Sequence, residues 1–558
     1  MSDGPERGSW RAPGGVPGRG ALLGAALAAG VLAAVAPLGD PDLPEHLAVG
    51  EWILRHGAVP WLEPFAWTRA GQPYYAYSWA AQVTYYGVLK LLGPVGLHLL
   101  QALIGVGAVL AAALWARRRG WGAGTAAVVG ALNFAALGAV ANQLRPEQLL
   151  FLLLPLAWAL ADAVAGDAAA AGGASQQATT AAPAAVAAWR RRGALLLLGH
   201  LAVGCAAANV HLFFALTAAP LALRLLAAPS GRRHFLLPGL ALVMGWLLSP
   251  YGSALGDVLA LNFTPNVLLR RPPAIGEMEP GFEAMFDVGA GAVLAILLLA
   301  LPWVRARQAA PGRERALEAL VWAGGLALFA YAYRLLAVWW LLSLPAVGAA
   351  VGAAAAGPGT RPRLRLAVVI GLAALMVGTG MPPWPRDLRL EGGVHRRTLP
   401  SSPAAAARPL AEWLVCHTGP GAGGRIFTSF NFGSYLTWRL PGYSVSLDGR
   451  TIFPDSVARE YAWALAGRNA PHALTWAYAD VAIIPRWLAV NDALAADPSW
   501  LRLADSNAGG GEIAILWARV AWWRRWQAPP RAPRSRGSAS CTRIEGITRE
   551  RAEAGGIP

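Results

Sequence analysis

Long apolar runs recur along most of this chain, separated by short stretches rich in arginine, glycine or acidic residues. Each run is close to the roughly 20 residues that a helix needs to cross a lipid bilayer. We therefore predict about eleven transmembrane helices, the second run being long enough for one span and an approach helix. The predicted spans are 20–38, 82–115, 121–141, 147–165, 193–209, 212–228, 234–250, 287–304, 316–333, 335–356 and 364–381.

The polar stretch 39–80 follows the first apolar run and contains a helix whose two ends are marked in the sequence. Asp42 is a candidate N-cap, and Glu45 stands three residues later, as in a capping box. Gly57 predicts that the helix ends after His56. The leucines of this segment recur at helical spacing, so we expect an amphipathic helix on the membrane surface.

The composition changes after the last predicted span. Residues 382–526 alternate short β-rich runs with turn residues and helical patches, which predicts a small α/β domain. Three further segments are expected to lie outside the folded parts: the N-terminal arm 1–19, which is basic, the low-complexity linker 166–192, and the tail 527–558. The tail is rich in proline, arginine and serine, and we expect it to be disordered.

The predicted fold class is thus an all-α polytopic membrane protein, with a transmembrane domain over 20–381 and a C-terminal extracytoplasmic α/β domain. Of 558 residues, 56% are hydrophobic and only 14% charged, which excludes an ordinary soluble protein. A net charge of +16 would suggest nucleic acid as the partner of a soluble chain. Here the arginines cluster between apolar runs, as membrane orientation requires, so we expect no nucleic-acid partner.

The arginine clusters also predict the orientation of the chain. Every cluster follows an even-numbered predicted span, so all clusters lie on the same side of the membrane as the basic N-terminus. By the positive-inside rule the N-terminus is cytoplasmic, and the outer loops 39–80 and 249–287 lie outside together with the C-terminal domain. The three cysteines show neither paired nor metal-like spacing, and we predict no disulfide framework.

This orientation brings many polar residues to the outer face. Polar groups at the membrane-embedded ends of helices are costly, and several of them on one side indicate a site or a pathway. They are Asp40, Asp42, Glu45 and His46 in the first outer loop, then Arg145, Glu147, Asn209 and His211, then Tyr251, Arg270, Arg271 and Glu277, and finally Arg334. We therefore expect any chemistry to be extracytoplasmic.

Several motifs occur in an informative order. The run DPDLPEHLAVGEWILRHGAVP is followed by EPFAWTRAGQPYYAYSW, and later come Arg145-Pro146-Glu147, Asn209-Val210-His211 and Ser249-Pro250-Tyr251-Gly252. Gly433-Ser434-Tyr435-Leu436 and Asp448-Gly449-Arg450 follow in the C-terminal domain. In this order the chain resembles largely uncharacterised bacterial membrane proteins related to GT-C glycosyltransferases, of the protein mannosyltransferase and aminoarabinose transferase kind. The resemblance covers nearly the whole chain. Pro44-Glu45 and Glu63 depart from the usual pattern, which puts the pocket and the activity in question.

The resemblance implies a multi-pass enzyme of the bacterial inner membrane that moves a sugar from a polyprenyl-phosphate carrier to a glycan, lipid or protein acceptor. It implies Asp40 as catalytic base, with Asp42 as its neighbour or as a metal ligand. A carboxylate within hydrogen-bond reach can take the proton of an attacking hydroxyl. Arg145, Arg334 and the pair Arg270/Arg271 are candidate phosphate contacts, because guanidinium groups bind phosphate by paired hydrogen bonds.

The remaining assignments stay open. His46 can orient a carboxylate or the phosphate, and Asp448 with Arg450 is either a turn closed by a salt bridge or an acceptor-binding element. No cofactor is certain; a divalent cation held by Asp40 and Asp42 is one option, supported only by two carboxylates. Asp42 and Glu45 also have a purely structural interpretation as helix caps. Two other functions remain open as well: a transporter or flippase of lipid-linked substrates, and a non-catalytic envelope scaffold.

Overall fold

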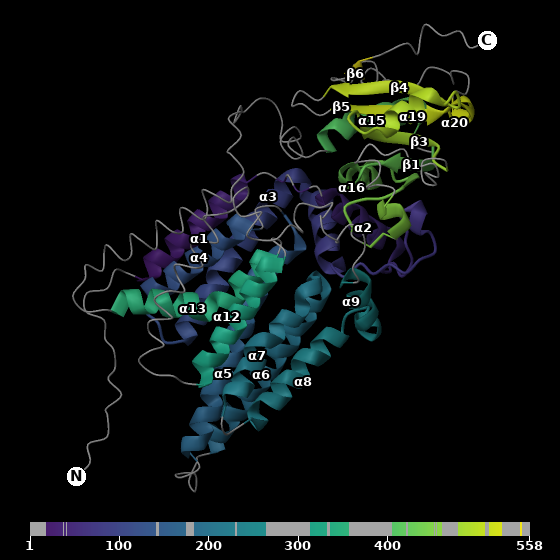
Figure 1. The fold of residues 1–558 in the computed structure, drawn as a ribbon. Coiled ribbons are helices and arrows are strands. Elements are labelled where there is room, and N and C mark those ends of the chain that lie inside the picture. The colour runs from purple at the N-terminus through teal and green to yellow at the C-terminus, as the bar shows by residue number, and fades with distance from the viewer. Residues whose placement is uncertain are drawn as a thin grey trace, which may run out of the picture.

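The computed structural model describes residues 18–36, 38, 40, 42–140, 144–174, 183–228, 232–263, 313–331, 335–356, 404–419, 422–450, 452–453, 455–459, 478–507, 513–526 and 547–548. Most of them are helical, and the C-terminal part forms a small sheet with helices. Figure 1 shows the long helices at one end of the molecule, the sheet at the other, and helices α2 and α16 between them.

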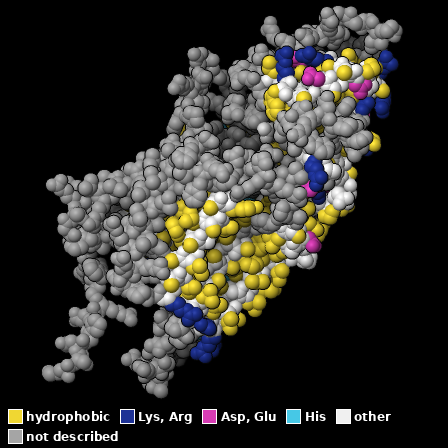
Figure 2. Space-filling view, viewed as in Figure 1, with side chains coloured by type: hydrophobic (Ala, Val, Ile, Leu, Met, Phe, Trp, Pro, Cys, Tyr) yellow, Lys and Arg dark blue, Asp and Glu magenta, His cyan; other side chains and the backbone are white. Residues whose placement is uncertain are grey.

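The helical part begins with α1 and continues to α13. Its helices are α1 (Gly18–Val35), α2 (Leu43–His56), α3 (Trp79–Arg118), α4 (Ala123–Val140), α5 (Leu150–Ala174), α6 (Pro183–Val210), α7 (Ala219–Ala227), α8 (Arg233–Leu247), α9 (Leu255–Phe263), α12 (Arg313–Tyr331) and α13 (Leu336–Ala356). One buried apolar core, which contains Trp115, Trp158 and Trp340, joins α3, α4, α5 and α13. Figure 2 shows a broad apolar surface over α6 and α8, as expected of a part that faces lipid.

Several of these helices suit a membrane. Among the described residues, Trp79–Arg118, Pro146–Ala168 and Arg190–Val210 are long and apolar enough to cross a bilayer. Arg233–Leu247 and Gly252–Asn262 together make a fourth candidate, bent by 101°. Shorter apolar helices occupy 19–35, 123–137, 212–227, 316–331 and 336–349. The predicted count of eleven spans is not confirmed, and two of the predicted spans, 287–304 and 364–381, lie outside the described residues.

Helix α3 is broken where the sequence predicted a span joined to an approach helix. Gly93 has φ 65° and ψ −165°, and Pro94 follows it. A positive φ favours glycine, and a proline at this point removes a backbone donor, so the helix divides there. The division leaves an approach helix over 79–92 and a long apolar helix over 94–118, which confirms the predicted arrangement.

Some segments expected to be irregular contain regular structure. The predicted linker 166–192 is helical at both ends, since α5 runs to Ala174 and α6 begins at Pro183. Alanine is the best helix former, and this outweighs the low complexity of the sequence. The predicted outer loop 249–287 starts with a 3₁₀ turn and α9, so its first part is not a loop. In the predicted disordered tail, Ile547–Thr548 forms strand β6.

Two carboxylates, Asp162 and Glu318, tie four helices together at the ends that carry arginines. Asp162 on α5 accepts hydrogen bonds from Arg119 Nε (2.6 Å), Arg224 Nε (2.8 Å) and Trp115 Nε1 (3.0 Å). Glu318 on α12 lies 3.4 Å from Arg119 Nη2. Arg119 and Arg224, which the sequence interpretation used only as orientation signals, therefore also hold helices together.

Helix α2 is the predicted helix of the first outer loop. It spans Leu43–His56 and ends at Gly57, whose φ is 64° and whose N–H donates to the Ile53 carbonyl. The predicted capping box does not form, because the Asp42 side chain makes no capping hydrogen bond and Glu45 is buried. Both carboxylates point elsewhere, and this frees them for the cavity described below.

The C-terminal domain is a mixed six-stranded sheet with helices packed on it. Its strands are β1 (Gly424–Thr428), β2 (Tyr443–Val445), β3 (Val481–Pro485), β4 (Trp500–Asn507), β5 (Ile513–Arg519) and β6, in the spatial order β2-β1-β3-β5-β4-β6. β1 is parallel to β2 and β3, and the other pairs are antiparallel. The helices are α15 (Ala404–Thr418), α16 (Phe430–Arg439), α19 (Val490–Ala496) and α20 (Val520–Trp526).

Two details of this domain differ from the sequence interpretation. The motif Gly433–Leu436 lies on α16, not in a β-rich run, because the helix inserts between β1 and β2. Cys416 on α15 is disulfide-bonded, whereas Cys205 is a free thiol and Cys541 lies outside the described residues. The sequence predicted no disulfide framework and gave no sign of this one bond. Single cysteines far apart in sequence give no spacing signal.

Candidate functional site

The second half of the first outer loop, residues 57–78, packs against the sheet edge of the C-terminal domain. Ala66 forms a parallel bridge with Val445, the last residue of β2, and the Val445 N–H donates to the Phe65 carbonyl at 3.0 Å. The Thr68 hydroxyl donates to the Ser446 carbonyl at 2.5 Å. The loop thus adds one isolated bridge to the β2 edge of the sheet.

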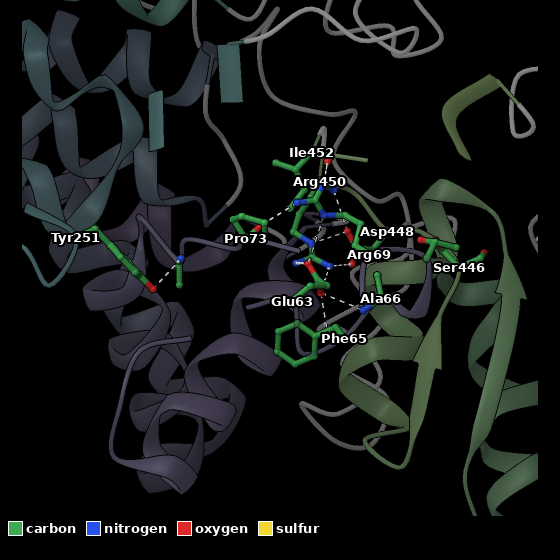
Figure 3. Close-up of polar contacts among 12 residues, drawn as sticks. Glu63, Phe65, Ala66, Arg69, Pro73, Tyr251, Ser446, Asp448, Arg450 and Ile452 are labelled. Atoms are coloured by element: carbon green, nitrogen blue, oxygen red, sulfur yellow. Dashed lines mark hydrogen bonds and ion pairs between the residues drawn. The ribbon is translucent and has the colours of Figure 1, made fainter. Parts of the chain in front are cut away.

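A buried ion-pair network fastens this contact (Figure 3). The Arg450 guanidinium donates to both oxygens of Glu63, with Nη1–Oε2 and Nη2–Oε1 each 2.9 Å. It also donates to Asp448, from Nε at 2.8 Å and from Nη2 at 2.6 Å. Glu63 Oε1 in turn accepts the N–H groups of Phe65 (2.9 Å) and Ala66 (3.0 Å). Glu63 and Asp448 side chains are fully buried, and only 8% of the Arg450 side chain is exposed.

Arg69 extends the same network, because its guanidinium binds one carbonyl of the loop 57–78 and one of the C-terminal domain. Its Nη2 donates to the Pro73 carbonyl at 2.8 Å, and its Nη1 donates to the Ile452 carbonyl. Burial alone would lower the pKa of Arg450, but Asp448 and Glu63 raise the pKa of this guanidinium well above its ordinary value. The guanidinium therefore stays charged and serves as a fixed bridge between the first outer loop and the C-terminal domain.

A cavity of about 370 Å³ lies beside this network, within the size range of ligand pockets. Three parts of the chain line it: the first outer loop with the start of α3, the helical part, and the C-terminal domain. The lining residues are Asp42, Glu45, His46, Tyr74, Tyr75, Ala76, Tyr77, Ser78 and Gln82, then Arg145, Pro146, Glu147, His211, Leu261 and Asn262, then Phe430, Asn431, Ser434, Gly449, Arg450 and Ile452.

Arg145 organises the two aspartates of the DPD motif. Its Nε donates to Asp40 Oδ2 at 2.6 Å, and its Nη2 lies 3.4 Å from Asp42 Oδ2. Asp40 is fully buried and does not line the cavity, and its other oxygen accepts the Asp42 N–H at 2.9 Å. Burial raises the pKa of Asp40, and Arg145 opposes this effect. Asp42, by contrast, lines the cavity and keeps 29% of its side chain exposed.

Glu147 and His211 complete the polar wall around Arg145. Glu147 Oε1 lies 3.8 Å from Arg145 Nη1, and Glu147 Oε2 lies 3.3 Å from His211 Nε2. His211 Nδ1 accepts the Phe213 N–H at 3.1 Å, so a neutral His211 carries its proton on Nε2, toward Glu147. His211 also caps the 3₁₀ helix Leu212–Ala218, a role that the sequence did not reveal.

Glu45 and His46 are adjacent on α2 and differ in their surroundings. Burial, followed by the nearby charges of Asp448, Asp42 and Glu63, raises the pKa of Glu45 well above its ordinary value, while Arg450 opposes this. Glu45 is 5% exposed, and within the described residues its carboxyl has no hydrogen-bond or ion-pair partner. Burial and Arg145 lower the pKa of His46 to about 3, so this imidazole is neutral. Its Nδ1 lies 3.2 Å from Gln82 Nε2.

Asp42 also contacts the C-terminal domain. A Cβ atom placed on Gly449 would collide with Asp42 Oδ1 and with the Ser434 hydroxyl. The same hydroxyl accepts the Gly449 N–H at 3.0 Å. The Asp448-Gly449-Arg450 turn therefore fits against the Asp42 carboxylate only because its central residue has no side chain.

The structure brings together many of the residues that the sequence singled out. Asp42, Glu45, His46, Arg145, Glu147, His211 and Arg450 line one cavity, and Asp40 and Asp448 directly contact its wall. Four candidates, Arg270, Arg271, Glu277 and Arg334, lie outside the described residues. The catalytic and binding roles of all these residues stay predictions.

Asn209 and Tyr251 are close to the site but do not line the cavity. Asn209 Oδ1 accepts the Trp79 indole N–H at 2.6 Å. The Tyr251 hydroxyl donates to the Pro60 carbonyl at 2.7 Å and accepts the Ala76 N–H at 3.0 Å. Asn209 therefore holds the start of α3 against α6, and Tyr251 holds the two ends of the loop 57–78.

Sequence reasoning missed some cavity residues and the partner of Arg450. The aromatic run Tyr74, Tyr75 and Tyr77 was quoted within a motif, but no role was given to it. Glu63 was noted only as a departure from the usual pattern. Phe430 and Asn431 at the start of α16 carried no signal, since nothing local shows that α16 approaches α2.

The fit of a divalent cation can be tested on the residues present. A guanidinium group occupies the position between Asp40 and Asp42 that a shared cation would take. Within the described residues, no group of three or more His, Cys, Asp or Glu side chains is arranged to hold a metal ion. The two aspartates as placed do not fit a metal, and no step below depends on one.

Comparisons with known proteins define the class of the fold. No protein-family model matches the chain, and no curated protein matches it. The oligosaccharyltransferase of Archaeoglobus fulgidus in its apo form aligns with a TM-score of 0.50 and 11% identity, over 84% of this chain and 69% of that one. The arabinofuranosyltransferase AftD from Mycobacteria aligns with a TM-score of 0.50 and 15% identity, over 90% of this chain and 40% of that one. The chain therefore shares its fold with these two solved structures, and at these identities the likeness shows the fold alone.

Proposed function

We propose that this chain is a membrane glycosyltransferase that moves a sugar from a polyprenyl-phosphate-linked donor to an acceptor hydroxyl, with an aspartate of the first outer loop as the base. One observation carries the proposal. In a chain with the GT-C fold, a single cavity gathers the first-loop carboxylates Asp42 and Glu45, the Arg145–Glu147 segment and the Asp448–Arg450 turn, which lie far apart in sequence.

Asp42 is the aspartate best placed to act as the base. Its carboxylate faces the cavity, whereas Asp40 lies behind it and is bound to Arg145. In the proposed step the acceptor oxygen attacks the anomeric carbon and gives its proton to Asp42. The bond between that carbon and the phosphate oxygen breaks, and the lipid phosphate leaves with the electron pair. Asp40 then acts by positioning Arg145, which holds Asp42 in place.

The other cavity residues suit the binding of a sugar and an acceptor. Tyr74, Tyr75 and Phe430 offer ring faces, and Asn431 and Ser434 offer hydrogen-bonding groups, which is the usual mixture of apolar and polar groups in ligand sites. Arg145 is already surrounded by Asp40, Asp42 and Glu147. The donor phosphate therefore needs further cations, and Arg270, Arg271 and Arg334 stay the candidates from the sequence.

We further propose that the cavity lies outside the cytoplasm of a bacterial cell, with the chain in the inner membrane and its N-terminus in the cytoplasm. The parity of the arginine clusters supports this orientation. The disulfide bond of Cys416 supports it as well, because disulfides persist mainly in oxidising compartments outside the cytoplasm. The acceptor, whether glycan, lipid or protein, is then an envelope component.

A reconstituted transfer assay tests the proposal. The purified full chain is placed in proteoliposomes with a panel of radiolabelled polyprenyl-phosphate sugars and a membrane extract as the source of acceptors. The expected result is release of polyprenyl phosphate together with a labelled acceptor. Movement of intact donor across the bilayer without cleavage would instead support a flippase. Binding of donor with neither cleavage nor movement would support the scaffold.

A further inference from the structure

A second groove lies away from the cavity, between the helical part and the C-terminal domain, and encloses about 370 Å³. It shares no lining residue with the first cavity. Its floor comes from Leu38, which follows α1, from the first half of α2 and from the region of the break in α3, and its opposite wall from α15 and α16. Nothing in the proposed transfer reaction uses it.

The floor of the groove is apolar. Leu38, Leu43, Leu47, Leu89 and Leu97 line it, together with the break at Gly93 and Pro94. The neighbouring turn of α3 carries leucines that point away from the protein, with Leu91 82% and Leu92 61% exposed. Side chains of this kind face lipid in a membrane protein. The groove is therefore reached from the bilayer, at the end of the long apolar helix 94–118.

The opposite wall is basic and aromatic. Arg408 and Arg439 both approach one carboxylate, with Arg408 Nε 3.0 Å and Arg439 Nη2 3.9 Å from Glu412 Oε1. Two guanidinium groups against one carboxylate leave a net positive charge, and 44% of each arginine side chain is exposed. Trp438 and Tyr435 complete this wall. Tryptophan and tyrosine are enriched at the membrane–water interface, where lipid headgroups lie.

We propose that this groove binds an anionic phospholipid of the surrounding bilayer, with one acyl chain on the leucine floor and the phosphate against Arg408 and Arg439. The charge of the wall complements a phosphate, and the position of the groove at the end of a span matches the level of a headgroup. The occupant joins two parts of the protein. Its chain contacts Leu38, α2 and α3, and its headgroup contacts α15 and α16 of the C-terminal domain.

This inference is independent of the transfer reaction, and lipid retention tests it directly. The full chain is reconstituted in nanodiscs of phosphatidylglycerol mixed with phosphatidylcholine, released into detergent, and analysed by native mass spectrometry. We expect the wild type to retain one phosphatidylglycerol in preference to phosphatidylcholine. Each arginine near a phosphate contributes about fivefold to binding. We therefore expect Arg408→Gln/Arg439→Gln to lower the affinity for phosphatidylglycerol by roughly 25-fold, combining the two, and most of the retained lipid to be lost.

The controls keep the outcome clear. Arg486→Gln removes one charge from an exposed position of the same domain and is expected to retain the lipid as the wild type does. Leu89→Trp narrows the floor, keeps both arginines, and is expected to lower retention as well. Equal retention of the two phospholipids by the wild type overturns the proposal. It is overturned equally if added polyprenyl phosphate displaces the bound lipid at equimolar amounts, since the groove would then belong to the donor carrier.

Discussion

Arg450 and Glu63, which are 387 residues apart in sequence, form a two-pronged ion pair in which both nitrogen–oxygen distances are 2.9 Å. Glu63 belongs to the first outer loop and Arg450 to the C-terminal domain. The pair is buried, and Asp448 closes it from the other side. It fixes the wall of the cavity, since Arg450 lines the cavity beside Asp42 and Glu45.

We predict that Arg450→Gln strongly destabilises the protein. The substitution removes the cation that the buried carboxylates Glu63 and Asp448 share, and only Glu63 keeps another, Arg69 at 4.0 Å. Removing one partner of a buried ion pair costs about 3–5 kcal/mol in the free energy of unfolding. Thermal unfolding of the purified chain in detergent measures this effect, and Arg486→Gln, at an exposed position, is the matched control. Equal unfolding midpoints for the two variants would show that the ion pair does not hold the domains together.

Tyr251→Phe is expected to destabilise the loop 57–78, which supplies part of the cavity wall. The lost hydroxyl leaves the Pro60 carbonyl and the Ala76 N–H without that partner. An unsatisfied buried group costs about 1–3 kcal/mol. Limited proteolysis within the loop, compared with the exposed control Tyr478→Phe, measures the effect. Unchanged cleavage in both variants would mean that Tyr251 does not fasten the loop.

Glu45→Gln is expected to flatten the dependence of stability on pH. The folded pKa of Glu45 is raised above the ordinary value of 4.5, so the folded state keeps a proton that the unfolded chain releases. The resulting stabilisation is complete below pH 4.5 and is lost as the pH rises through the folded pKa. Glutamine stays neutral throughout. Unfolding midpoints from acidic to neutral pH should therefore fall less steeply in Glu45→Gln than in the wild type or in Asp492→Asn, an exposed control. An identical slope in all three proteins would contradict this account of Glu45.

Gly449→Ala is expected to lower sugar transfer more than stability. The added methyl group would collide with the Asp42 carboxylate and the Ser434 hydroxyl, so it displaces the proposed base. We expect about a 10²-fold loss of transfer, the cost of displacing a catalytic group by roughly 1 Å. Gly87→Ala, with no atom close to the added methyl group, is the control. Full transfer by Gly449→Ala would place the reaction away from Asp42.

The ends and breaks of individual helices could be predicted from the sequence. Helix α2 ends at Gly57 as predicted, and α3 divides at Gly93 as an approach helix followed by a span. Both predictions depend on nearest neighbours along the chain, where propensity and backbone geometry decide. The capping box failed because Asp42 and Glu45 face the cavity and the C-terminal domain, and tertiary contacts outweigh a local cap.

The long-range contacts of the site could not be predicted from the sequence in the same way. The sequence grouped Arg145, Glu147 and His211 with the first outer loop on the basis of orientation, and they do line one cavity. It gave no sign that Glu63 would pair with Arg450, or that α16 would lie beside α2. Such contacts depend on how the two parts of the chain pack, and one sequence carries no periodic signal for that.

The rate of sugar transfer in proteoliposomes, compared between matched variants, decides whether Asp42 is the base of the proposed reaction. Asp42→Asn keeps the shape of the side chain and removes its basic carboxylate, and Asp492→Asn makes the same change at an exposed position. We expect Asp42→Asn to lose about 10²–10⁴-fold in rate with an unchanged unfolding midpoint, and Asp492→Asn to match the wild type. Wild-type rates in Asp42→Asn, with the loss found only in Asp40→Asn, would contradict the account and make Asp40 the base.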